Sequence, residues 1–216
     1  MIKSFRTQIK LLKYGSSIKS SIATAVLFWL LGIAFLVMDS NAFILGGLYM
    51  LAGLLMLLQI HNTLLGIGMV TASPKRRMLE TWMIDILSLL MGICYYIFLV
   101  IVEMIKMHLA AGDMKQQYGT ALVFAGIMGG WILVYCGLAW KSFLISVVVF
   151  TGGFFLVFTK FDEAINEGMS INLGTGVLLG FLAVVLGAAV AGIIRRIFYK
   201  KPVSKYAMGA NLRKQM

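Results

Sequence analysis

The distribution of positive charge constrains the fold of this chain more than any other feature. Six apolar runs are visible, at residues 21–38, 42–70, 82–102, 118–139, 142–158 and 173–194. The 19 basic residues lie before the first run, in every second connection or after the last run, with the exceptions of Lys106, Lys115 and Lys160. Apolar runs of about 20 residues are typical of helices that cross the roughly 30 Å hydrocarbon core of a bilayer.

The same charge pattern predicts the orientation, because cytoplasmic connections of membrane proteins are rich in Lys and Arg. With the N-terminus inside, almost all basic residues become cytoplasmic. Most acidic residues fall outside; they are Asp39, Glu103, Asp113, Asp162, Glu163 and Glu167. The sequence therefore predicts an all-α integral membrane protein with six transmembrane helices and both termini in the cytoplasm.

Composition supports this class of protein. Apolar residues make up 61% of the 216 residues and charged residues only 12%, which does not suit a water-soluble domain. The net charge of +11 is concentrated beside the apolar runs, where it favours anionic lipid headgroups over nucleic acid. Cys94 and Cys136 both fall inside apolar runs, so no disulfide framework is expected.

The chain divides into three parts. Residues 1–20 are expected to form an amphipathic helix at the membrane surface, because Phe5, Ile9 and Leu12 recur at helical spacing beside a stripe of basic residues. A merely basic tail is the alternative for this segment. Residues 21–194 form the membrane domain, and residues 195–216 form a basic cytoplasmic tail.

The connection between the second and third runs is short, basic and interrupted by Pro74. Because proline suits the first turn of a helix, this connection is expected to contain a short surface helix that leads into the third run. Asp85 then lies one turn inside that run. An acidic residue at this depth is a candidate functional residue. The alternative is a structural role, in which Asp85 forms an ion pair with Arg77 or another basic residue at the cytoplasmic end.

The connections on the predicted outer side contain fewer sequence features that indicate structure. Residues 103–117 are predicted to be a polar connection with room for a short amphipathic helix. The fifth run is short, and its helix is expected to end near Gly152 and Gly153, with residues 160–172 as an outer loop.

Small residues recur three or four positions apart in the fourth and sixth runs. They are Gly126, Gly130, Gly176, Gly180, Ala183, Gly187 and Ala191. Faces of this kind let helices approach closely in lipid. They indicate close packing within the bundle or, as the alternative, a dimer seam.

Catalytic and metal-binding motifs are not visible in the sequence. The two histidines, His61 and His108, fall on opposite sides of the predicted membrane, and no nucleophile motif or phosphate-binding loop is present. We therefore expect no enzyme activity, no catalytic residue, no metal site and no cofactor on this chain.

The order of these features resembles the membrane-spanning subunit of ABC-2-type ATP-binding-cassette exporters. The resemblance covers the layout of nearly the whole chain, and its local motif is residues 71–81, TASPKRRMLET. It implies that this segment couples to a separate cytoplasmic ATPase that carries ATP and magnesium. The implied coupling residues are Ser73, Pro74, Lys75, Arg76, Arg77 and Glu80.

The resemblance also implies a second permease subunit, either identical or related, and a location in the plasma membrane of a bacterium. Small exporters of this kind move amphipathic peptides and toxins. A cavity lined by Met, Phe and Leu side chains is expected to suit such apolar cargo.

Two other functions stay open at this point. One is the small substrate-binding component of an energy-coupling-factor importer, which needs convergent polar groups for its ligand. The other is a non-transport membrane assembly protein held together by its small-residue faces.

Overall fold

The computed structural model describes residues 18–38, 43–65, 74, 76–109, 117–139 and 141–201. Within these ranges the secondary structure is helical and contains no strand. The helices are α2 (Ile18–Met38), α3 (Phe43–Leu65), α5 (Arg76–Glu80), α6 (Trp82–Leu109), α7 (Gln117–Ala139), α8 (Phe143–Asn166) and α9 (Leu173–Phe198). The predicted interfacial residues Phe5, Ile9 and Leu12 lie outside the described residues.

The long apolar runs form helices because lipid offers no partners for backbone polar groups, so each segment must pair its own. Five described helices are long and apolar enough to cross a membrane, namely α2, α6, α7, α8 and α9. In α3 the corresponding apolar stretch is the shorter Gly46–Leu58. Val148, Phe155 and Ile197 are each about two-thirds exposed on the outer surface. An exterior of this kind is typical of a multi-pass membrane protein.

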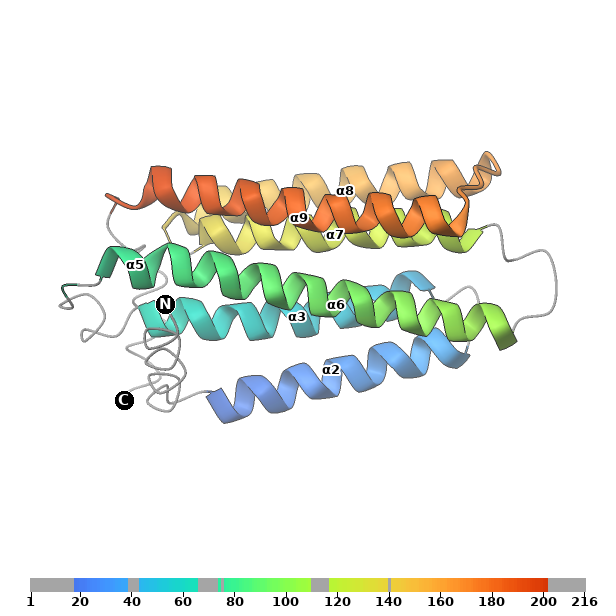
Figure 1. The fold of residues 1–216 in the computed structure, drawn as a ribbon, viewed down its shortest axis with the longest axis horizontal. Helices are drawn as coiled ribbons and strands as arrows, with labels where there is room; N and C mark the ends of the chain where they lie inside the picture. The colour runs from blue at the N-terminus through green and yellow to red at the C-terminus, as the bar shows by residue number, and fades with distance from the viewer. Residues whose placement is uncertain are drawn as a thin grey trace.

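The helices run side by side along the long axis of the molecule and alternate in direction (Figure 1). Helix α2 packs on α3 at one side, α7, α8 and α9 form the other side, and α6 contacts both groups. One end of the bundle carries Arg77, Lys141, Arg195, Arg196 and Lys200, and we call it the basic end. The opposite end carries Glu103, Asp162, Glu163 and Glu167, and we call it the acidic end.

Several helices extend beyond the apolar runs. Helix α6 continues to Leu109, so Glu103 lies within a helix and not in the polar connection predicted for residues 103–117. Helix α2 begins at Ile18, and α9 continues to Phe198. Arg195 and Arg196, assigned to the basic tail from the sequence, therefore belong to the last turns of α9.

The prediction that the fifth helix ends near Gly152 and Gly153 is wrong, because α8 passes through both residues to Asn166. Glycine here serves packing. A Cβ atom at Gly153 would lie 2.0 Å from the Trp131 ring, so the absence of a side chain lets α8 approach α7. The helix ends at Asn166, and the turn after it contains Gly168, whose φ of 70° places it in the left-handed region. There the backbone N–H of Met169 donates to the carbonyl of Ala164, a common helix termination.

Helices α7 and α9 make the most extensive contact in the bundle, and they meet through their small-residue faces. A Cβ atom at Gly126 would lie 2.3 Å from the carbonyl oxygen of Gly180, and one at Gly187 would lie 2.3 Å from Cα of Gly130. Of the alternatives drawn from the sequence, packing within the chain is the one observed at these four glycines. A dimer seam on the same atoms would compete with this packing.

The first prediction concerns this contact. Gly126→Ala should destabilise the bundle by about 1–3 kcal/mol, because the new methyl group meets backbone atoms that side-chain motion cannot clear. The measurement is thermal unfolding of the purified protein in detergent. Gly152→Ala is the matched control, because a Cβ atom there meets nothing within 4 Å. Equal melting temperatures for the two variants would contradict the role given to the glycine contact.

Candidate functional site

The basic end is organised around a buried ion pair between the first turn of α6 and the end of α9. The Arg195 guanidinium donates to Asp85 Oδ1 at 2.7 Å and to the Ser88 hydroxyl at 3.2 Å. Arg195 is only 3% exposed, so it depends on these acceptors for its hydrogen bonds. A Cβ atom at Gly192 would lie 3.2 Å from Asp85 Oδ2, which shows how closely the carboxylate fits against α9.

Arg196 contacts the same carboxylate from the solvent side. Its guanidinium lies 3.7 Å from Asp85 Oδ2 and 4.9 Å from the centroid of the Trp82 ring. Trp82 is half-exposed, as is typical of tryptophan at a membrane–water boundary. The ion-pair alternative for Asp85 is therefore the one that the structure contains. Its partners are Arg195 and Arg196 of α9.

The residues predicted to couple to an ATPase lie beside this cluster. Ser73 and Lys75 are outside the described residues, Pro74 is exposed in a turn, and Arg76 begins α5. The Arg77 side chain is exposed, whereas Glu80 is fully buried and cannot form part of an exposed docking surface.

Helix α5 continues almost directly into α6. Only Thr81 separates the two helices, and its hydroxyl and its backbone N–H both donate to the carbonyl of Arg77, at 2.7 and 3.1 Å. The N–H of Asp85 in turn donates to the carbonyl of Thr81 at 2.9 Å. A displacement of α5 would therefore reach Asp85 through a continuous series of helical hydrogen bonds.

Lys141, in the turn between α7 and α8, attaches a further connection to the end of α9. Its ammonium group donates to the carbonyls of Tyr199 at 3.2 Å and Lys201 at 2.6 Å. Carbonyl groups at a helix C-terminus lack partners within the helix, and a nearby cation satisfies them. Lys141 is accordingly buried although it carries a charge.

The acidic end is held together by Thr120 of α7. Its hydroxyl donates to the carbonyl of Met169 at 3.0 Å and accepts from the N–H of Ile171 at 3.3 Å. The side chain of Asn172 caps the start of α9 by accepting from the N–H of Gly174. The described residues 167–172, between α8 and α9, contain no helix of their own.

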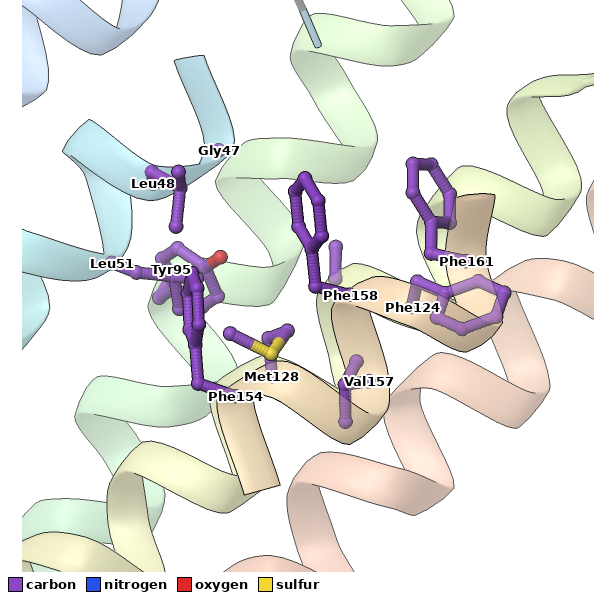
Figure 2. Close-up of a pocket in the computed structure, with 11 residues that line it drawn as sticks. Gly47, Leu48, Leu51, Tyr95, Phe124, Met128, Phe154, Val157, Phe158 and Phe161 are labelled. Atoms are coloured by element: carbon purple, nitrogen blue, oxygen red, sulfur yellow. The ribbon is translucent and has the colours of Figure 1, made fainter. Parts of the chain in front are cut away.

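An apolar pocket lies between α3, α6, α7 and α8 (Figure 2). Its free volume is about 60 Å³, which is room for several water-sized groups. Four phenylalanines dominate its wall, namely Phe124, Phe154, Phe158 and Phe161. The rings of Phe124 and Phe161 meet edge to face at 4.7 Å. This wall agrees with the apolar cavity expected from the composition of the runs, although only Met128 represents the methionines.

Tyr95 is the polar residue of this pocket. It is fully buried, and its hydroxyl has no hydrogen-bond partner. The neighbouring Tyr96 differs, because its hydroxyl donates to the carbonyls of Gly176 at 3.3 Å and Val177 at 3.1 Å. Sequence reasoning missed Tyr95. The sequence feature that could have indicated it is the pair of adjacent tyrosines, Tyr95 and Tyr96, in the middle of an apolar run.

Searches against family models, curated proteins and solved structures found no match to this chain. Among the residues that the structure describes, no three His, Cys, Asp or Glu side chains gather in a way that could hold a metal ion. The basic end and the pocket are therefore the two features of the described structure that indicate a function.

The second prediction tests the ion pair. Asp85→Ala should lower the free energy of unfolding by about 3–5 kcal/mol, because it leaves the Arg195 guanidinium buried without its counter-charge. Arg196→Gln is the control and should cost less than about 1 kcal/mol, because this side chain is 54% exposed. Both values come from denaturant titration in detergent. If Asp85→Ala unfolds no more easily than Arg196→Gln, the pair does not hold α6 to α9.

Proposed function

We propose that this chain is the transmembrane permease subunit of an ATP-binding-cassette exporter of the ABC-2 type. In this proposal six helices cross the plasma membrane, the basic end faces the cytoplasm, and a separate ATPase subunit binds ATP and magnesium. A second permease subunit completes the transporter. The cargo is an amphipathic peptide or another apolar molecule.

The observation that carries the proposal is the continuity of α5 with α6. Helix α5 presents the exposed Arg77 at the basic end, and α6 is bonded there to α9 through Asp85 and Arg195. Further along, α6 contributes Tyr95 to the apolar pocket. A partner that moves α5 therefore acts on one rigid element that connects the surface to the pocket. Coupled transport requires a link of this kind.

The pocket supports an apolar cargo over a polar one. A vitamin-like ligand of an importer would need several convergent polar groups, and this wall offers the Tyr95 hydroxyl alone. A non-transport assembly protein needs neither an open pocket nor a surface helix connected to it. Export of apolar cargo gives both features a role.

The third prediction concerns orientation. In a Cys94→Ala, Cys136→Ala background, a cysteine placed at Glu163 should react with a membrane-impermeant maleimide on intact cells. A cysteine placed at Lys200 should react only after the cells are permeabilised. Both positions are exposed, so a difference in labelling reports the side of the membrane. The reverse pattern would overturn the orientation and, with it, the cytoplasmic ATPase.

The fourth prediction concerns coupling. Arg77→Glu should weaken copurification of the ATPase and lower cargo-stimulated ATP hydrolysis by about tenfold, because charges at an interface steer and orient a partner. Lys160→Glu is the matched control. It makes the same change of charge at an exposed position near the acidic end.

Orientation and membrane level must be equal in the two variants, which the labelling assay above verifies. Normal ATPase binding and turnover in a correctly inserted Arg77→Glu protein would exclude α5 as the coupling element.

A further inference from the structure

The apolar pocket contains one feature that packing alone does not explain, namely the unpaired hydroxyl of Tyr95. Tyr95 is 0% exposed, and its oxygen faces the space bordered by Leu48 and Phe158 in Figure 2. It lies about 20 Å from the start of α6 at a rise of about 1.5 Å per residue, near the middle of the helix. Water is scarce at such a depth in a bilayer, so the hydroxyl needs a partner from the protein or from a ligand.

The pocket opens between helices on the side of Tyr95, and a partner from outside the chain would reach the buried hydroxyl through a small displacement of the side chains around it. Gly47 lines it from α3, and a Cβ atom there would meet nothing within 4 Å. Phe154 and Phe158 line it from α8. A space of about 60 Å³ between α3 and α8, with apolar walls and one polar group, can hold a carbonyl group and a short part of an acyl or isoprenoid chain, with the rest of the molecule outside in the bilayer.

The chemistry of the wall limits the ligand. No charged side chain lines the pocket, so a charged group would enter without a counter-charge. A peptide backbone would bring several N–H donors that find no set of acceptors. A phenol is a stronger donor than acceptor, so it is best satisfied by an oxygen that only accepts, such as the carbonyl of an ester or a quinone.

We propose that this pocket binds an uncharged membrane lipid through one carbonyl oxygen that accepts the Tyr95 hydroxyl. The apolar part of the lipid fills the space between Gly47 and the phenylalanines of α8. The carbonyl belongs to a fatty ester or to an isoprenoid quinone, since both enter from the bilayer. This is the same pocket that the proposed exporter function assigns to apolar cargo, so the lipid names the cargo class that its wall fits; binding itself requires no ATPase and can be tested without one.

The test uses the full chain in nanodiscs of diether phospholipid, which has no ester carbonyl. A diacylglycerol with a diazirine in one acyl chain is the probe, because it is an uncharged diester, and its diether analogue is the control probe. Mass spectrometry measures labelling of the segments that contain Met128 and Phe158. We expect the ester probe to label these segments about fivefold more than the ether probe, as the loss of one hydrogen bond implies.

Matched variants separate the hydroxyl from the cavity. Tyr95→Phe should reduce labelling by the ester probe to the level of the ether probe. Tyr96→Phe should leave the ratio unchanged, because that hydroxyl bonds to α9. Gly47→Leu should fill the cavity and lower labelling by both probes. Gly152→Leu should not, because Gly152 is exposed on α8 and does not line the pocket.

A short-tailed isoprenoid quinone, added as a competitor, identifies the source of the carbonyl. Displacement of the ester probe in the wild type but not in Tyr95→Phe assigns the quinone, and lack of displacement assigns the ester. Equal labelling by the ester and ether probes in the wild type, or an unchanged ratio in Tyr95→Phe, would overturn the site. Labelling of these segments by a photoreactive amphipathic peptide in place of the lipid probe would also overturn it.

Discussion

The close approach of α7 and α9 is the constraint on which the rest of the bundle depends. In lipid, packing replaces the hydrophobic effect as the force between helices, and glycine faces let backbones come near enough for that packing to be strong. Gly126, Gly130, Gly180 and Gly187 provide those faces. With α9 set against α7, Arg195 reaches Asp85 of α6 and Tyr96 reaches the carbonyls of α9. The pocket wall on α7 and α8 is fixed by the same arrangement.

Polar bonds then stabilise the two ends that glycine packing leaves open. At the basic end, Asp85 bonds α6 to the last turns of α9, and Lys141 bonds the turn between α7 and α8 to the residues that follow α9. At the acidic end, Thr120 holds the loop that leads into α9. Each bond joins segments far apart in the sequence, and each uses a side chain near a helix end, where polar groups are tolerated. In the core of the described bundle, Tyr95 and Tyr96 are packed among apolar side chains.

The positions of the helices could be predicted from the sequence, since apolar composition decides which segments enter lipid. Their ends could not. Glu103, Lys160 and Arg195 look like loop or tail residues, yet each continues a helix, because long polar side chains can extend toward the interface while the backbone stays paired. The ion pair of Asp85 was foreseen, but its partner on α9 depends on which faces of the helices meet. The pocket around Tyr95 could not be predicted either, because it also depends on which helix faces meet.

The separation between Asp85 and Arg195 has a consequence for the synthesis of the chain. The two residues are 110 positions apart, and Arg195 lies on α9, which is made after the other described helices. At roughly 5–20 residues per second, Asp85 waits on the order of 10 seconds for its partner, and the glycine face of α7 waits uncovered for part of that time. The described bundle can therefore close only when α9 has been made. A chain truncated before α9 would leave the glycine face of α7 uncovered and Asp85 without the Arg195 guanidinium.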